Sequence, residues 1–264
     1  MRASLGHLRS TFICALRACG GIGAVLKGRE THEEIDREGF FETDILVGNA
    51  LVDMYAKCDA LVEAQEVFEK LPFQDIVSWT VLISGYAQHG HGEEALKCFE
   101  QMQDEGISPN TVTFICVLKA CGIVRSLEVG EDIHAEVEKR GLLPKYVMLS
   151  TSLVDMYAKC CALEKAREVF EQISMRNVVC WNALISGYAQ NGFGDEAVKC
   201  FKKMQDEGIS PNALTYICIL KICGFFVSLD VGRELHAEIR KQGLLQKDVV
   251  LGTTLIDMYA KCGM

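Results

Sequence analysis

The chain has 264 residues, of which 49% are hydrophobic and 24% are charged, and its formal net charge is −9. This composition is typical of a folded globular or repeat protein and excludes an intrinsically disordered chain. The negative charge argues against broad attraction to phosphates or anionic lipids, so it is an objection to nucleic-acid binding. The most hydrophobic run, VTFICVLKACGIV, is interrupted by Lys119, so we expect a soluble chain without a membrane span.

The first eight residues are predicted to form a short stub before the first repeat unit. Five lysines and arginines precede the first acidic residue, Glu30, as they would in an organellar transit peptide. From Arg9 onward, however, the chain is already repeat sequence, and eight residues are too few for an ordinary transit signal. We therefore expect no transit peptide within this chain.

The string DMYAKC occurs three times, beginning at Asp53, Asp155 and Asp257, and each copy lies 102 residues from the next. Most of the 13 cysteines recur at the same interval, so their number reflects internal duplication and not a disulfide framework. We expect them to be small buried side chains in a reducing compartment. Only Cys161 and Cys180 lack a counterpart at this interval.

A shorter period lies within each 102-residue block. Alignment of the apolar landmarks divides the block into units of 35, 36 and 31 residues. The predicted units are 9–44, 45–75, 76–110, 111–146, 147–177, 178–212 and 213–248, followed by a partial unit over 249–264.

Each unit is predicted to form two helices joined by a turn. In the unit 76–110, apolar side chains recur at i, i+3, i+4 and i+7 from Trp79 to Tyr86, and again from Ala95 to Met102. Glycines separate the two segments, and Pro109 follows the second. A single hairpin of this kind leaves its apolar face uncovered, whereas a stack of hairpins shares one core. The expected fold is an all-α solenoid of helix-turn-helix repeats.

Two families build solenoids from hairpins of this size, the tetratricopeptide and the pentatricopeptide repeats. The segment VVCWNALISGYAQNGFGDEAVKCFKKMQDEGISPN, residues 178–212, closely resembles the pentatricopeptide motif. The alternation of unit lengths resembles its plant subclass of mixed long and short (PLS) motifs. The likeness covers residues 9–264 and implies a right-handed α-solenoid superhelix. The array stops at Met264 within a unit, so either the natural chain is longer or its end pairs with something, and we expect a fragment that lacks C-terminal extension domains.

The resemblance implies sequence-specific binding of single-stranded RNA in a mitochondrion or chloroplast, with one repeat for each nucleotide. The protein would run from its N- to its C-terminus along the RNA from 5′ to 3′. The resemblance also implies that the chain guides organellar RNA editing or processing that another domain or partner carries out. An editing deaminase or an accessory editing factor is therefore an expected partner beside the RNA.

In this family, bases are discriminated by the fifth residue of a motif, on its first helix, and by the last residue of the motif. Polar groups there can match the donors and acceptors of a base edge. The resemblance assigns four such recognition pairs to this chain: Asn49 with Asp75 for uracil, Thr80 with Asn110 and Thr151 with Asn177 for adenine, and Asn182 with Asn212 for cytosine. The implied site is U-A-N-A-C, and we expect the four pairs to line one wall.

Other family positions are carried over in the same way. The second residue of a motif would insert an apolar wedge between bases, here Leu46, Val77, Met148 and Val179. Basic residues near the phosphates would be Lys57, Lys159 and Lys261, whereas Gln88 and Gln190 replace them in the 35-residue units. The fifth residues of the 36-residue units are Ile13, Ile115 and Ile217, which lack a hydrogen-bonding group and are interpreted as spacers or packing positions.

No catalytic or metal-binding motif is evident. A zinc deaminase would carry H-x-E followed by P-C-x-x-C. The strings HAE at 134–136 and 236–238 supply the first part, but the chain contains no C-x-x-C. Cysteines such as Cys14 and Cys19 are five residues apart and do not share a helix face, which disfavours zinc. We expect a protein that is not an enzyme and that needs no metal or cofactor.

The alternative function is a protein–protein interaction scaffold built on a solenoid like that of the tetratricopeptide repeats. The acidic charge favours this alternative, and the recognition pairs disfavour it. Four matched bases also recur about once in a few hundred random nucleotides, so selection of one transcript requires further repeats or partners.

Overall fold

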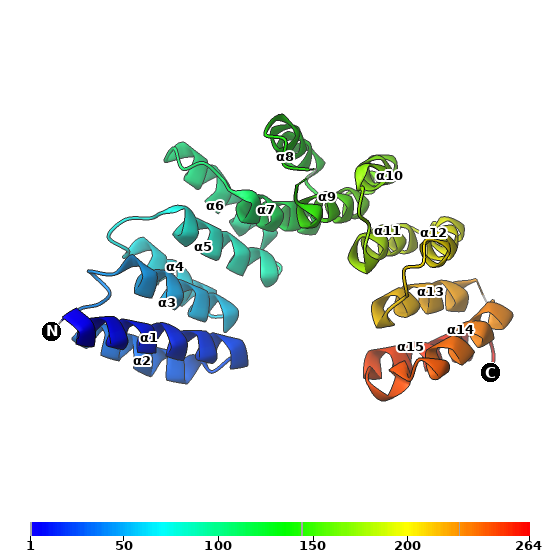
Figure 1. The fold of residues 1–264 in the computed structure, drawn as a ribbon, viewed down its shortest axis with the longest axis horizontal. Coiled ribbons are helices and arrows are strands. Elements are labelled where there is room, and N and C mark those ends of the chain that lie inside the picture. Colours follow the sequence, from blue (N-terminus) through cyan, green and yellow to red (C-terminus); the bar gives the residue numbers. More distant parts are fainter. Residues whose placement is uncertain (1, 144, 227) are drawn as a thin grey trace. The chain divides into compact units, whose positions relative to one another are not determined.

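The computed structural model describes residues 2–143, 145–226 and 228–264 (Figure 1). Every regular element within these ranges is a helix, which confirms the expected all-α class. None of the described helices combines the length and the apolar character that a membrane crossing requires. The chain divides into two compact units, Met1–Val129 and Gly130–Met264.

The helices follow one another without intervening strands in the described residues. The first compact unit contains α1 (Arg2–Ile22), α2 (Val25–Arg37), α3 (Ile45–Lys57), α4 (Leu61–Glu69), α5 (Ile76–Gln88), α6 (Gly92–Asp104) and α7 (Thr111–Val124). Helix α8 (Leu127–Lys139) contains residues of both compact units. The second contains α9 (Val147–Lys159), α10 (Leu163–Gln172), α11 (Val178–Gln190), α12 (Gly194–Asp206), α13 (Ala213–Phe225), α14 (Leu229–Lys241), the short 3-10 helix η1 (Leu244–Gln246) and α15 (Val249–Lys261).

The odd-numbered helices are the first helices of the repeat units, and the even-numbered ones are the second helices. From α3 to α15, each first helix begins at the first residue of a predicted unit. Helix α1 differs, because it begins at Arg2 and continues without a break past residue 8. The predicted stub is therefore helical and continuous with the first unit.

Polar residues cap most of the first helices and set where these helices begin. Asp75, Asn110, Asn177 and Asn212 each have an extended backbone and accept hydrogen bonds from N–H groups of the following helix turn. These four residues are also the last residues of four predicted units. The N-cap of a first helix and the second member of a recognition pair are thus the same side chain.

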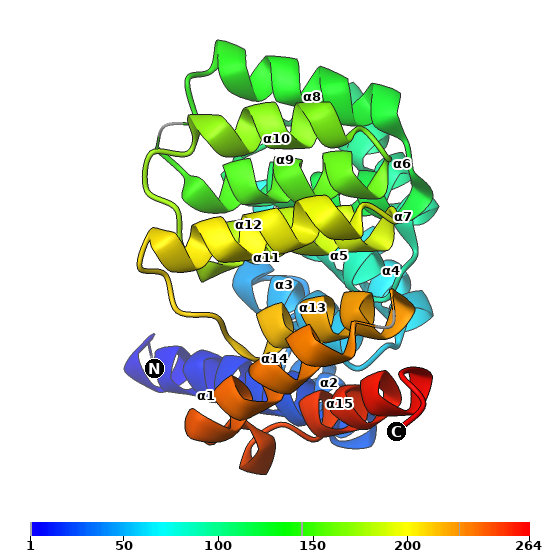
Figure 2. The same ribbon diagram turned by 90° about the vertical axis from the view of Figure 1, so that its right-hand side faces the viewer.

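The core repeats itself between the two compact units. Helix α5 packs against α3, α6 and α7, and α11 packs against α9, α12 and α13. Figure 2 shows α11 beside α12 and α9 beside α10. Phe68 and Trp79 meet edge to face, with ring centroids 4.6 Å apart and an interplanar angle of 66°, and Phe170 and Trp181 do so at 4.6 Å and 65°.

Close helix approach depends on one glycine in each of α5 and α11. A Cβ atom added at Gly85 would lie 2.6 Å from the Cβ of Ala56 on α3. The equivalent atom at Gly187 would lie 2.5 Å from the Cβ of Ala158 on α9. Both distances are far below van der Waals contact, so the spacing of neighbouring first helices, and of the polar residues on them, requires glycine at these positions.

Candidate functional site

Each recognition pair joins a first helix to the N-cap of the next first helix. In the pair assigned to uracil, Asn49 Nδ2 of α3 donates to Asp75 Oδ1 over 3.4 Å. The same Asp75 oxygen accepts from the Val77 and Ser78 backbone N–H groups at 2.9 and 2.8 Å and from the Ser78 hydroxyl at 2.9 Å. Burial of the carboxylate disfavours its charge, but the hydrogen bonds from Ser78, Asn49 and Val77 outweigh this effect and lower the Asp75 pKa.

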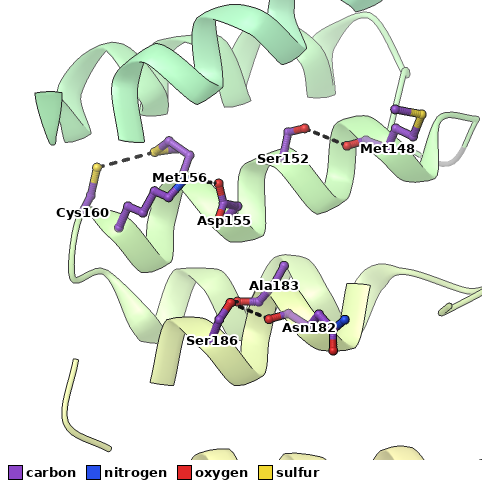
Figure 3. A network of polar contacts seen from close by, with 9 residues as sticks. Met148, Ser152, Asp155, Met156, Cys160, Asn182, Ala183 and Ser186 are labelled. Atoms are coloured by element: carbon purple, nitrogen blue, oxygen red, sulfur yellow. Dashed lines mark hydrogen bonds and ion pairs between the residues drawn. The ribbon is translucent and has the colours of Figure 1, made fainter. Parts of the chain in front are cut away.

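The pair assigned to cytosine is bonded in the same way but with a different third partner. Asn182 Nδ2 of α11 donates to Asn212 Oδ1 over 3.0 Å. The Thr215 hydroxyl donates to Asn182 Oδ1 over 2.7 Å, and the Thr215 backbone N–H donates to Asn212 Oδ1 over 3.1 Å. Figure 3 shows Asn182 on α11, where its backbone carbonyl also accepts from the Ser186 hydroxyl at 2.6 Å.

The two pairs assigned to adenine are linked through one intervening side chain. Thr80 Oγ1 lies 2.7 Å from Thr113 Oγ1, which lies 3.2 Å from Asn110 Oδ1. In the second compact unit, Thr151 Oγ1 lies 3.2 Å from Cys180 Sγ, which lies 3.4 Å from Asn177 Oδ1. The structure therefore brings the two members of all four pairs together.

The two members of a recognition pair differ strongly in exposure. The first-helix residues Asn49, Thr80 and Asn182 are only 6%, 8% and 4% exposed, and Thr151 is half-buried. The N-cap residues Asn110, Asn177 and Asn212 are exposed, and Asp75 is half-buried. Neighbouring helices therefore cover most of the first-helix member in three of the four pairs.

The predicted wedge residues are large apolar side chains in solvent. Leu46, Val77, Met148 and Val179 are 50%, 47%, 72% and 58% exposed, and each is the second residue of a first helix. Sequence reasoning missed that this feature extends to the units without a recognition pair. The same position is exposed in α7, α13 and α15, where it holds Val112, Leu214 and Val250. An apolar residue at the second position of each first helix could have predicted these exposed side chains.

The predicted phosphate-contacting lysines form ion pairs within their own helices. Lys57 Nζ lies 2.6 Å from Asp53, and Lys159 and Lys261 lie 2.7 Å from Asp155 and Asp257. Figure 3 shows Asp155 on α9, the helix that carries Lys159. Asp and Lys four residues apart are neighbours on a helix, so DMYAKC itself carried this signal. The aspartates offset the positive charge that would attract a phosphate.

The isoleucines of the 36-residue units lie where packing positions are expected. Ile217 is buried, and Ile13 and Ile115 are half-buried. The unit ending at Tyr146 also differs at its boundary, because Tyr146 makes no side-chain cap to α9.

The two HAE strings take part in packing. His134 Nδ1 lies 2.8 Å from the Tyr157 hydroxyl on α9, and His236 Nδ1 lies 3.0 Å from the Tyr259 hydroxyl on α15. Burial lowers the pKa of His134, which favours its neutral form. Among the described residues, no three His, Cys, Asp or Glu side chains gather as metal ligands would.

Comparison with known proteins places this architecture in a family. Sequence models described as PPR repeat family and PPR repeat together match residues 49–122 and 150–224, which is more than half of the chain. The chain belongs to the pentatricopeptide repeat family. These matches include all eight members of the four recognition pairs.

Relatives in the pentatricopeptide repeat family are considerably longer than this chain. A chloroplastic pentatricopeptide repeat-containing protein of Arabidopsis thaliana is 37% identical over 252 residues, which cover 96% of this chain and 40% of the relative. A mitochondrial one from the same plant is 38% identical over 254 residues, covering 96% of this chain and 36% of the relative. These names confirm the expected localisation in a chloroplast or a mitochondrion.

A solved structure shares the fold of this pentatricopeptide repeat chain. The pentatricopeptide repeat protein PPR10, crystallised in complex with an 18-nt psaJ RNA element, matches with a TM-score of 0.71. The match covers 90% of this chain and 35% of PPR10 at 20% sequence identity. At this identity the likeness concerns the fold alone.

Proposed function

We propose that this chain binds single-stranded RNA through its four recognition pairs, each facing one base. The observation that carries the proposal is the hydrogen-bonded link between the two members of every pair. Members that are 26 to 30 positions apart in the sequence meet at the start of a first helix in each case. A core would not need four such polar clusters, whereas recognition of a base edge needs fixed donors and acceptors.

The difference in exposure gives the two members of a pair different roles in base recognition. The N-cap side chain presents its amide or carboxylate to the base edge, and the first-helix residue behind it holds that group and adds its remaining accessible atoms. The exposed apolar residue two positions after each N-cap, such as Val77 after Asp75, offers a surface for the face of a base. Stacking on such surfaces supplies affinity, and the polar pair supplies the choice of base.

The decisive experiment measures fluorescence polarisation of a short RNA that contains U-A-N-A-C, at low salt. RNAs with each of the four bases permuted singly serve as controls. We expect Asn182→Thr to move the preference at the last position from C to A. Binding that ignores every permutation would refute RNA recognition and support the protein scaffold, which the net charge of −9 favours.

The lysine ion pairs give this experiment an internal control. Lys57→Gln should weaken binding of all the RNAs alike and reduce the slope of log affinity against log salt by about 0.7, as for one contact to a single strand. A change of base preference in Lys57→Gln would contradict the assignment of this lysine to a phosphate.

The biological role is proposed on the family resemblance. The chain spans 24% to 45% of the length of these relatives in Arabidopsis. We propose that it directs organellar RNA editing or processing, as PLS-type proteins do, with the chemistry done by another domain or by an editing deaminase or accessory factor.

A further inference from the structure

A third side chain contacts every recognition pair. It is the third residue of the following first helix, and it is fully buried in all four cases: Ser78, Thr113, Cys180 and Thr215. These residues were not among the positions that the family resemblance singled out. Each lies within hydrogen-bonding distance of the N-cap member of its pair.

The two adenine pairs differ only in this residue. Both consist of a threonine and an asparagine, but Thr113 joins one pair and Cys180 joins the other. The hydroxyl contacts of Thr113 measure 2.7 and 3.2 Å, whereas the thiol contacts of Cys180 measure 3.2 and 3.4 Å. Thr113 also accepts from the Asn110 backbone N–H at 3.3 Å and completes a capping box. A thiol is a weak donor and a weak acceptor, so it holds its pair less firmly.

The two pairs whose first-helix member is an asparagine, Asn49 with Asp75 and Asn182 with Asn212, show a second effect of the linking residue. The Thr215 hydroxyl donates to Asn182 Oδ1, so this oxygen is occupied. The Ser78 hydroxyl donates to the Asp75 carboxylate instead, and Asn49 Oδ1 is buried without a hydrogen-bond partner among the described residues. The same amino acid in the first helix therefore has an occupied carbonyl oxygen in one pair and an unpaired one in the other.

This difference matches the chemistry of the two pyrimidines. Uracil carries an N–H donor at N3, and cytosine carries an acceptor there. Asn49 Oδ1 is buried here, so it meets the uracil N–H only after the Asn49 amide turns toward the base, a turn that no hydrogen bond to this oxygen opposes. Asn182 Oδ1 already accepts from Thr215, and one amide hydrogen of Asn182 is bonded to Asn212. Its second amide hydrogen can donate to the cytosine acceptor.

We propose that the third residue of the following first helix is a positioning residue that sets the hydrogen-bond character of the recognition pair before it. The proposal rests on RNA recognition by these pairs. It predicts that this residue changes the choice of base without touching the RNA, because it is buried behind the pair.

The first test exchanges the linking residues between the two adenine pairs. Thr113→Cys should lower the preference for A over other bases at the nucleotide that faces residues 76–110, by about two- to tenfold, as expected for one neutral hydrogen bond. Cys180→Thr should raise the preference for A over other bases by a similar factor at the nucleotide that faces residues 147–177. In each variant, the ratio at the other adenine serves as the unchanged control.

The second test removes the hydroxyl from the cytosine pair. Thr215→Val should lower the ratio of affinities for C over U at the nucleotide facing residues 178–212 by about two- to tenfold, and Thr215→Ser should restore it. Thermal unfolding of each variant identifies loss of the helix cap. A purely structural role would weaken all RNAs equally and leave this ratio unchanged.

The outcomes separate the two proposals. If the wild-type chain discriminates bases but none of the substitutions alters a ratio at its own nucleotide, the positioning role is refuted and RNA recognition stands. If the wild-type chain shows no base preference, RNA recognition fails and the positioning role fails with it. Ratios that change only at the predicted nucleotides support both.

Discussion

Residues 45–113 and 147–215 are two diverged copies of one sequence, 102 positions apart, and the recognition clusters are among the places where they differ. The cores agree closely, since Trp79 and Trp181 pack in the same geometry. The first recognition cluster, in contrast, changes at every position, from Asn49, Asp75 and Ser78 to threonine, asparagine and cysteine. The duplicated scaffold tolerates these changes because polar residues at the helix starts contribute less to stability than the large apolar side chains of the core.

The largest predicted effect tests whether the cores of the two copies contribute equally to stability. Trp79→Ala and Trp181→Ala should each destabilise the chain by about 3–5 kcal/mol, because each removes a buried aromatic side chain. Urea unfolding monitored by circular dichroism measures the two losses. The exposed Val77→Ala should change stability by less than about 0.5 kcal/mol. Clearly unequal losses for the two tryptophans would show that the copies are not energetically equivalent.

Substitution of a glycine at the contact between two first helices should change stability by a smaller amount. Gly85→Ala should destabilise by about 1–3 kcal/mol, because its Cβ would overlap the Cβ of Ala56. Gly21 in α1 is the matched control, since a Cβ there meets no atom within 4 Å in the described part of the chain. Gly21→Ala should be neutral or stabilise by up to about 1 kcal/mol through helix propensity. Equal effects of the two substitutions would contradict the helix spacing described here.

The smallest effect concerns the N-caps Asp75 and Asn177, which occupy the same place in the two copies. Asp75 has a lowered pKa in the folded chain, so its charge stabilises the fold above the unfolded pKa of about 3.9, and this contribution is lost as the pH falls through the folded value. Asp75→Asn should therefore cost less than about 1 kcal/mol at pH 7 and progressively less at lower pH.

The reciprocal Asn177→Asp should add a similar pH dependence to the second copy. Urea unfolding at pH 7 and pH 3 measures both changes. A loss in Asp75→Asn that is the same at the two pH values would show that the charge contributes nothing. In RNA binding, Asp75→Asn should also move the preference at the first nucleotide from U to C.

Sequence reasoning was most successful where the causes are local. The starts of α3 to α15 coincide with the predicted unit starts because N-caps and apolar periodicity act within one or two helix turns. It was less successful at the site, where Asn49 and Asn182 lie largely covered by neighbouring helices. It also missed the pairing of Lys57 with Asp53, although their spacing indicates it.

The sequence by itself determined the helical hairpins, the lengths of the repeat units and their repetition, because periodicity, caps and duplication all act within short stretches of chain. Only the tertiary structure decided which side chains meet at each helix start. Thr80 contacts Thr113 across 33 positions, and Cys180 takes the equivalent place beside Thr151. Such contacts depend on how closely two first helices pack. That spacing is set by other residues, such as the glycines and alanines that meet between the helices.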